Sequence, residues 1–213
     1  MPIRVYDYHQ DIANLVVHPE IRGRFMQMQP SPAGRMHSHD LGGEIFLVLE
    51  GQCEFLVEDE RVTCGPGQLI YVEPRLKHTL HAVGDQTCII YLSVTPHVEP
   101  THTQYDEHYE KVAPRYGTWR GKEHPDPNPN ISTADLAGQY TEAAHALAHL
   151  AQANANVQQE CLEKLRSALD AGDQGVVKET MDELWYSLRS VLEQVSATEL
   201  AWNALAPRGM PTK

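Results

Sequence analysis

The sequence predicts an α+β protein in which a mainly β barrel precedes an α-helical hairpin. Three observations carry this prediction, one for each part of the 213-residue chain. Residues 1–98 contain short β-rich segments separated by turn residues, and short strands at close spacing are typical of a sandwich or barrel. Residues 99–131 are rich in proline and show little periodicity. Residues 132–206 carry apolar residues at helical spacing, interrupted by the turn-forming sequence AGDQG.

The predicted strands of the barrel are apolar and lie between turn sequences. The segment EIFLVLEG, which begins at Glu44, places Phe46 and Val48 on the same face as the carboxylate. Three aliphatic residues of the same segment point to the other face. Because both faces are apolar, we expect this strand to be buried on both sides, as in a closed or double-walled β structure.

The connecting segment, residues 99–131, differs from the parts that flank it. Its aromatic residues lead us to expect that it packs on the barrel rather than extending into solvent. The residues that define it are Pro114, Pro125, Pro127 and Pro129, with Tyr105, Tyr109, Tyr116 and Trp119.

The helical region begins with the sequence STAD at Ser132, which indicates a capping box with Asp135 in place of the usual glutamate. Two apolar stripes follow, and their alternating steps of three and four predict an antiparallel helix pair. The first stripe is Leu136, Tyr140, Ala143, Leu147, Leu150, Val157, Cys161, Leu165 and Ala168. The second is Val177, Met181, Leu184, Leu188, Val191, Val195, Trp202 and Leu205. The polar residues Asn154 and Thr198 also fall on these seams.

A hairpin of two helices buries only one side of each helix. Alanines at 144, 148, 151 and 155 widen the apolar face of the first helix. We therefore expect the helices to pack on the barrel or on a second copy, and we favour a symmetric homodimer with a four-helix contact.

Composition argues against several classes of function. The formal net charge is −12, so the protein would repel a phosphate backbone and we expect no nucleic-acid partner. No apolar stretch approaches the roughly 20 residues that cross a bilayer, so we expect no membrane partner. The N-terminal residues lack the pattern of a signal peptide, so we expect a cytoplasmic protein. We expect the four cysteines to be reduced and mostly structural, because none form a CxxC motif.

Two histidines and a glutamate near residue 40 are candidate metal ligands. Alternate residues of a strand point to the same face about 7 Å apart, so His37 and His39 can converge on one ion. The sequence DLGG then allows the chain to reverse, and Glu44 opens the next strand within reach of the same ion. A second segment, residues 65–78, contains a glycine–proline turn, a strand and finally His78.

These two segments resemble the motifs of the cupin superfamily. The first cupin motif has two histidines separated by one residue, followed by a glutamate and a glycine. The second has a glycine turn, a strand, a proline and a histidine. The corresponding residues are His37, His39, Glu44 and Gly51 in the first motif, and Gly67, Pro74 and His78 in the second.

The resemblance covers about residues 20–95 and implies a double-stranded β-helix, which is a small β barrel. It also implies that one divalent metal is held inside the barrel by His37, His39, Glu44 and His78. The chain departs from the family pattern at Arg75, where glycine is frequent, and at Ala82, where asparagine is frequent. Neither position is a metal ligand, so these departures concern the turn rather than the metal.

Some cupins keep the fold and lose the ligands, but all four positions here carry competent ligands. Burying three imidazoles and a carboxylate without a metal would cost on the order of several kcal/mol unless they paired with one another. We therefore expect a transition metal with up to two open positions. The ligand set suits Fe, Mn, Ni, Co, Cu or Zn and does not choose among them.

The open positions favour an enzyme acting on a small oxygenated molecule. Within the cupin resemblance we favour a dioxygenase-like oxidoreductase over an isomerase or lyase, with Glu44 acting as a base. The inner face suits an aromatic or enolic substrate, and the residues expected to line this pocket are Phe46, Val48, Tyr71 and Leu80. The alternative is a non-catalytic sensor that binds a metal or small ligand and passes the signal through its helical tail.

The remaining histidines are weaker candidates. His97, His102 and His108 lie close in sequence, but no spacing fixes two of them together, so we favour a loop over the barrel rather than a second metal site. On the first helix, His145 and His149 share a face with a glutamate opposite the apolar stripe. We interpret that face as solvated rather than as half of a di-metal site.

Overall fold

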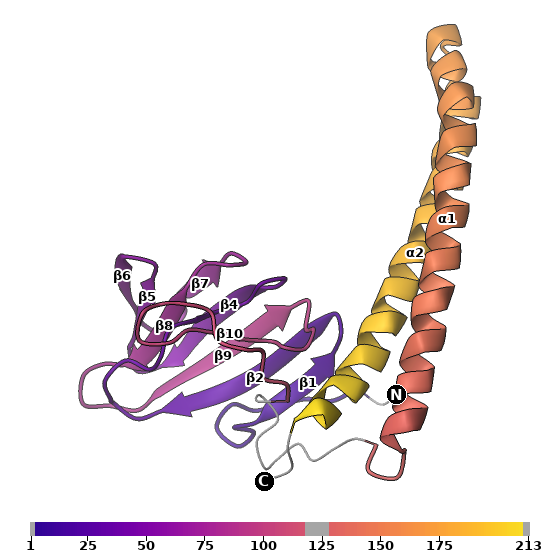
Figure 1. The fold of residues 1–213 in the computed structure, drawn as a ribbon. Coiled ribbons are helices and arrows are strands. Elements are labelled where there is room, and N and C mark those ends of the chain that lie inside the picture. The colour runs from indigo at the N-terminus through magenta and orange to yellow at the C-terminus, as the bar shows by residue number, and fades with distance from the viewer. Residues whose placement is uncertain (1–2, 118–127, 211–213) are drawn as a thin grey trace. The chain divides into compact units, whose positions relative to one another are not determined.

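Strands pair in two antiparallel sheets that face each other, and a helical hairpin follows them in the chain. A computed structural model describes residues 3–117 and 128–210, and Figure 1 shows their fold. The chain divides into two compact units, one formed by residues 1–127 with 206–213 and the other by residues 128–205. Each unit is described by itself below.

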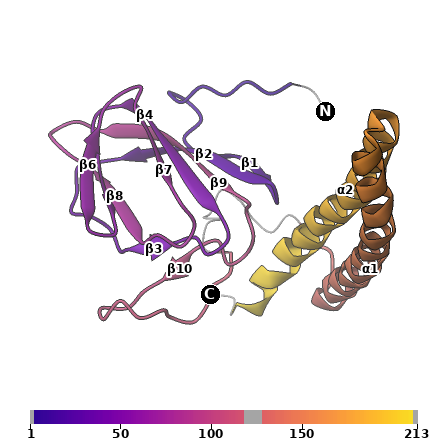
Figure 2. The same cartoon turned by 90° about the horizontal axis from the view of Figure 1, so that it is seen from above.

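The first sheet contains, in spatial order, β1 (Asn14–His18), β2 (Ile21–Met28), β9 (Cys88–Thr95), β4 (Gly43–Glu50) and β7 (Leu69–Val72). The second contains β10 (Thr103–Gln104), β3 (His37–Ser38), β8 (His78–Ala82), β5 (Cys53–Val57) and β6 (Glu60–Cys64). Figure 2 shows the two sheets as opposite walls. The predicted mainly β fold followed by two helices is confirmed. The barrel is not closed, because no ladder joins the two sheets within the residues that the structure describes.

The strand register of the first sheet explains where the polar and apolar parts of the interior lie. Arg22 of β2 and Glu44 of β4 both pair with Val94 of β9, so all three side chains point to the same inner face. The neighbouring inward row contains Phe46 and Leu92. One end of the interior is therefore polar, and the rest is an apolar core. That core comprises Phe46, Val48, Cys53, Phe55, Cys64, Val72, Ala82, Cys88, Ile90 and Leu92.

All four cysteines are free and buried. Cys53, Cys64 and Cys88 belong to the apolar core, and Cys161 lies in the first helix. Their burial agrees with the structural role expected from the sequence, since free cysteine in a core behaves as a small apolar residue.

The helical hairpin consists of α1 (Thr133–Ala171) and α2 (Gln174–Leu205), and the 3-10 turn η1 (Ala206–Gly209) follows it. The predicted cap at the start of α1 is confirmed, because the Asp135 amide donates a 3.1 Å hydrogen bond to the Ser132 hydroxyl. At the other end of α1, Gly172 adopts the left-handed conformation with φ of 69° and its amide donates to the Leu169 carbonyl. Within the described residues, no helix is long and apolar enough to span a membrane.

The contact seam of the hairpin agrees with the sequence on α1 and differs from it on α2. Every predicted apolar position of α1 is buried or half-buried. On α2, however, Met181 and Leu188 are 51% and 40% exposed, so their assignment to the seam was wrong. Thr180 is fully buried in place of Met181, and Ser187 donates a 2.9 Å hydrogen bond to Asn154 of α1. A polar pair across the seam thus replaces the expected apolar contact.

The connecting segment packs against the second sheet through β10. Tyr105 is buried, and its hydroxyl forms a 2.8 Å hydrogen bond with Ser38 of β3. Tyr105 packs as the sequence led us to expect, whereas Tyr109 is 60% exposed. Trp119, Pro125 and Pro127 lie outside the described residues, so the same expectation for them stays a prediction.

Candidate metal centre

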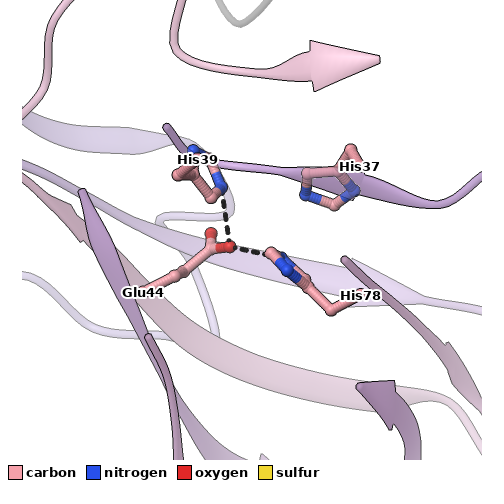
Figure 3. A group of neighbouring side chains, drawn as sticks. All are labelled: His37, His39, Glu44 and His78. Atoms are coloured by element: carbon pink, nitrogen blue, oxygen red, sulfur yellow. Dashed lines mark hydrogen bonds and ion pairs between the residues drawn. The ribbon is translucent and has the colours of Figure 1, made fainter. Parts of the chain in front are cut away.

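Four side chains from three strands and one turn meet at the polar end of the interior. His37 lies on β3, His39 follows β3 directly, Glu44 lies on β4 and His78 lies on β8. Each offers one ligand atom, and these four atoms all lie within 4.8 Å of one another (Figure 3). The structure therefore brings together all four residues that the sequence motifs indicated.

Strand pairing and one tight turn produce this convergence. His37 pairs with His78 across β3 and β8, which places the two rings on the same face. Glu44 comes from the opposite sheet, and the turn that precedes it passes very close to the end of β9. A Cβ at Gly42 would lie 2.8 Å from the Pro96 carbonyl oxygen, so only glycine fits there without displacement.

Glu44 is the centre of the contacts within this group. Its Oε2 lies 2.9 Å from His39 Nε2 and 3.0 Å from His78 Nε2, as Figure 3 shows. Glu44, His39 and His78 are only 2–3% exposed. Ligand atoms placed about 2.1 Å from one ion and at right angles lie about 3 Å apart, so these separations suit a shared metal ion.

The hydrogen bonds of Nδ1 in His39 and His78 explain why a cation fits between these rings and Glu44. His39 Nδ1 donates to the Thr101 carbonyl, and His78 Nδ1 donates to the Leu76 carbonyl at 3.0 Å. A neutral imidazole has one N–H, so both rings would then direct the lone pair of Nε2 toward the Glu44 carboxylate. That arrangement is repulsive unless a cation lies between the groups. The backbone contacts also fix the ring orientations, as is usual for histidines that bind a metal.

The charge states agree with this donor set. Without a metal, protonated Nε2 atoms of His39 and His78 would instead donate hydrogen bonds to Glu44. Burial alone would raise the pKa of Glu44, but these hydrogen bonds hold it well below its ordinary value. Burial, together with the nearby His78, lowers the pKa of His37 to about 3. The site therefore presents a carboxylate and a neutral His37 near neutral pH, which are the forms that coordinate a metal.

A buried arginine adds a positive charge to the same end of the interior. Arg22 is 2% exposed, and burial lowers its pKa to about 10, against the opposing effects of Glu44 and Glu99. The sequence reasoning missed this residue. Its position between apolar residues in a strand gave no signal until the register of β2 with β9 was known.

Three of the four residues predicted to line a pocket face the interior, and the fourth does not. Phe46 and Val48 are 1% exposed and face the interior beside Glu44, and Leu80 packs against the same core. Tyr71 was assigned wrongly to the pocket. It pairs with Ile45, which points away from Glu44, and it is 56% exposed on the outer face, where its ring covers Gly43. Side chains alternate between the two faces along β4 and β7, so a shift of one residue in the pairing moves each side chain to the other face. The sequence alone did not determine this register.

The other histidines do not form a second metal site within the described residues. His97 is buried and contacts Thr101, whereas the His108 side chain is 78% exposed. His145 and His149 are exposed on α1, as the solvated-face interpretation predicts. His102 is different, because its ring centroid lies 5.0 Å from that of His37 and 4.9 Å from that of His39. The sequence reasoning did not connect it with the site.

The fold and the site together define a double-sheet β protein whose interior has a three-histidine, one-glutamate group that can hold a metal. Residues 24–95 match the family model described as "Cupin domain", and the chain therefore contains a cupin domain in this region. This is the resemblance that the two motifs indicated. No curated protein matches the chain.

Several solved structures resemble the chain in fold. A protein with a double-stranded beta-helix domain from Klebsiella pneumoniae is 15% identical, covering 45% of this chain and 91% of that one, with a TM-score of 0.40. A cupin-2 domain containing protein from Shewanella frigidimarina is 17% identical, covering 43% and 85%, with a TM-score of 0.35. A cupin 2 domain-containing protein from Halorhodospira halophila is 20% identical, covering 42% and 61%, with a TM-score of 0.38.

One further feature of the cupin region explains a departure from the family pattern. Arg75, which occupies a position where glycine is frequent, has a φ of 74° in the left-handed region. Its amide donates a 2.8 Å hydrogen bond to the carbonyl of His39, one of the four candidate ligands. The turn after Pro74 therefore keeps the conformation that favours glycine, and Arg75 adopts it.

Proposed function

We propose that the protein is a metal-dependent enzyme that acts on a small oxygenated molecule at the centre formed by His37, His39, Glu44 and His78. The observation that carries this proposal is the convergence of four buried or half-buried ligand atoms within 4.8 Å. Four ligands leave up to two positions of a six-coordinate ion for other molecules, which favours catalysis over a closed structural site. The cation would be a divalent transition metal such as Fe, Mn, Ni, Co, Cu or Zn.

A metal bound here would supply Lewis-acid polarisation of a carbonyl, enol or carboxylate oxygen, or hold O2 beside the substrate. The chain itself supplies orientation and exclusion of water. The Thr101 and Leu76 carbonyls hold the rings of His39 and His78, and the apolar residues Phe46 and Val48 cover the inner side of the site. Glu44 is the one carboxylate of the four-residue group, so it is our candidate for the general base.

Within this proposal we favour a dioxygenase-like reaction on an aromatic or enolic substrate over an isomerase or lyase reaction. The apolar wall beside the ligands supports such a substrate, because it suits a planar, partly apolar molecule better than a free sugar. Arg22, buried at the same end of the interior, supports a substrate that carries a negative charge.

The proposal is tested by metal analysis followed by oxygen uptake with the Fe(II) form and a panel of enols, catechols and diketones. Turnover by the wild-type protein that is lost in His37→Ala and kept in His145→Ala supports the enzyme. His145 is the matched control because it is exposed on α1. Stoichiometric binding of a panel compound with no turnover by any metal form supports a sensor instead.

A feature of the second unit favours an additional role in assembly. On α2, Met181, Trp185, Leu188 and Leu192 are 40–52% exposed and follow steps of four, three and four. This is the spacing of a coiled-coil seam. The charged residues beside this stripe pair within the helix, Lys178 with Asp182 and Arg189 with Glu193. The exposed apolar stripe supports our proposal that the hairpin forms a homodimer through a second copy of itself.

A further inference from the structure

His102 lies next to the candidate metal centre because a short strand aligns its segment with β3. Thr103 and Gln104 of β10 pair with Ser38 and His37 of β3. Continuing this antiparallel register by one residue places His102 opposite His39. Residues that are opposite in a ladder direct their side chains to the same face, so His102 faces the side of β3 that carries both ligand histidines.

The ring distances agree with the register. Centroid separations among His37, His39 and His78 are 4.3, 5.4 and 5.6 Å. His102 lies 5.0 Å from His37 and 4.9 Å from His39, so it is as close to these two rings as they are to each other. It is nevertheless outside the group of four ligand atoms that lie within 4.8 Å of one another. His102 therefore borders the ligand set without completing it.

The segment that carries His102 is anchored on both sides. The Thr101 carbonyl accepts the hydrogen bond from His39 Nδ1, and the Tyr105 hydroxyl contacts Ser38 at 2.8 Å. The first of these contacts is with His39, which follows β3, and the second is with Ser38 in β3. The position of the His102 backbone is therefore tied to that of the candidate ligands. A side chain held in this way is suited to contacting a molecule bound at the metal.

The charges around His102 indicate which kind of molecule it would contact. The His102 ring places its nitrogens beside the rings of His37 and His39. A neutral imidazole offers one N–H donor and one acceptor nitrogen. Arg22 is buried on the same inward row as Glu44, and its guanidinium favours an anionic molecule at this end of the interior.

We propose that His102 is a substrate-binding residue that hydrogen-bonds to an oxygen of a small anionic molecule held at the open positions of the metal centre. This inference rests on the proposed metal-dependent function and adds a residue outside the ligand set. The substrate would therefore bind the metal through an oxygen atom, as a catecholate or an enolate can. It would also have a hydrogen-bonding group on the side of His37 and His39.

The test uses the full-length Co(II)-loaded protein and 4-nitrocatechol, whose visible absorption changes when it binds a metal. His102→Phe keeps the ring size and removes both nitrogens, whereas His102→Gln keeps a donor and an acceptor. His108→Phe is the matched control, because it lies in the same segment with a side chain that is 78% exposed. Circular dichroism of each variant establishes that the fold is kept.

We expect His102→Phe to weaken 4-nitrocatechol binding about tenfold or more, which corresponds to about 1.4 kcal/mol. His102→Gln should recover part of this loss, and His108→Phe should bind as the wild type does. Co(II) affinity should change less than about threefold in all three variants. Unchanged 4-nitrocatechol affinity in His102→Phe would overturn the inference.

Two other outcomes also count against it and can be told apart from each other. If His102→Phe loses Co(II) to the same extent as His78→Ala, His102 is a metal ligand and not a substrate contact. If the wild-type protein binds Co(II) but not 4-nitrocatechol, no such molecule reaches the open positions, and the inference fails while the metal site stands. A wild-type protein that binds no Co(II) overturns the proposed function and this inference with it.

Discussion

Glu44 and His78 lie in opposite sheets of the cupin domain, yet Glu44 Oε2 and His78 Nε2 are 3.0 Å apart. They are 34 residues apart in sequence. The contact therefore links the two walls of the β sandwich at its polar end. A metal held by both residues would connect the sheets in the same way, so its binding has consequences for stability as well as for chemistry.

Metal should stabilise the first unit measurably. A ligand that binds only the folded state at 100 times its Kd adds about 2.7 kcal/mol to the free energy of unfolding. We expect urea unfolding of the chelator-treated protein to show a gain of about this size when Co(II) or Ni(II) is added. The same addition should leave His78→Ala unchanged. An equal gain in that variant would mean that the metal stabilises the protein from another site.

The metal-free protein should lose stability as the pH falls from about 6.5 toward 3. The pKa of His37 is about 3 and that of His102 is about 2 in the folded state, both below the ordinary value of about 6.5. The unfolded chain therefore takes up protons that the folded chain does not, which lowers the free energy of unfolding as the pH decreases.

Each of these two groups should contribute about 1.4 kcal/mol between about pH 7.5 and about pH 5.5. Urea unfolding at both pH values measures the change, and His102→Phe should remove about 1.4 kcal/mol of it. A pH dependence in that variant equal to that of the wild type would contradict the assigned burial of the His102 ring. His145→Ala, on an exposed face of α1, serves as the control.

Gly51 should be much less tolerant of alanine than Gly84. Both adopt positive φ, 70° and 82°. A Cβ at Gly51 would also press against the Thr87 carbonyl oxygen, whereas nothing lies within 4 Å of a Cβ at Gly84. Left-handed backbone alone costs alanine on the order of 1 kcal/mol, so Gly84→Ala should lose about that amount and Gly51→Ala at least about twice as much. Thermal unfolding of the two variants measures the difference, and equal losses would show that the carbonyl moves aside freely.

The homodimer proposal predicts a concentration-dependent mass that depends on the exposed stripe of α2. The wild-type protein should give a dimer mass by light scattering at micromolar concentration. The double variant Trp185→Glu with Leu188→Glu should be monomeric, because it places charge in an apolar seam. Tyr186→Ser is the control, since Tyr186 is 61% exposed but lies off the stripe. A monomeric wild type would exclude the dimer.

Local chemistry made much of the fold and the ligand set predictable. The spacing of His37 and His39, the reversal before Glu44 and the cap at Ser132 each depend on residues a few positions apart. His78 was found because it follows a recognisable turn, a strand and Pro74, in the order of the second cupin motif. In these places the sequence pattern and the structure depend on the same short-range geometry.

Long-range register accounts for most of what the sequence did not show. Tyr71 faces outward because it pairs with Ile45, and one residue of register decides between the two faces. His102 lies near His37 and His39 because β10 pairs with β3. The paired residues Ser38 and Thr103 are 65 positions apart in the sequence. On α2, the choice between Thr180 and Met181 for the seam depends on how the two helices rotate against each other, and a hydrogen bond across the seam helps to fix that choice.

The most direct test of the account is the metal content of the purified protein after reconstitution with Fe(II), Mn(II), Co(II), Ni(II) or Zn(II) and removal of excess metal. We expect about one equivalent of at least one metal in the wild type and in His81→Ala, and less than about 0.1 equivalent in His78→Ala. His81 is the matched control because it lies on the same strand and contacts Glu54 instead of Glu44. A wild type that retains no metal, or a His78→Ala variant that retains a full equivalent, would contradict the assignment of this centre.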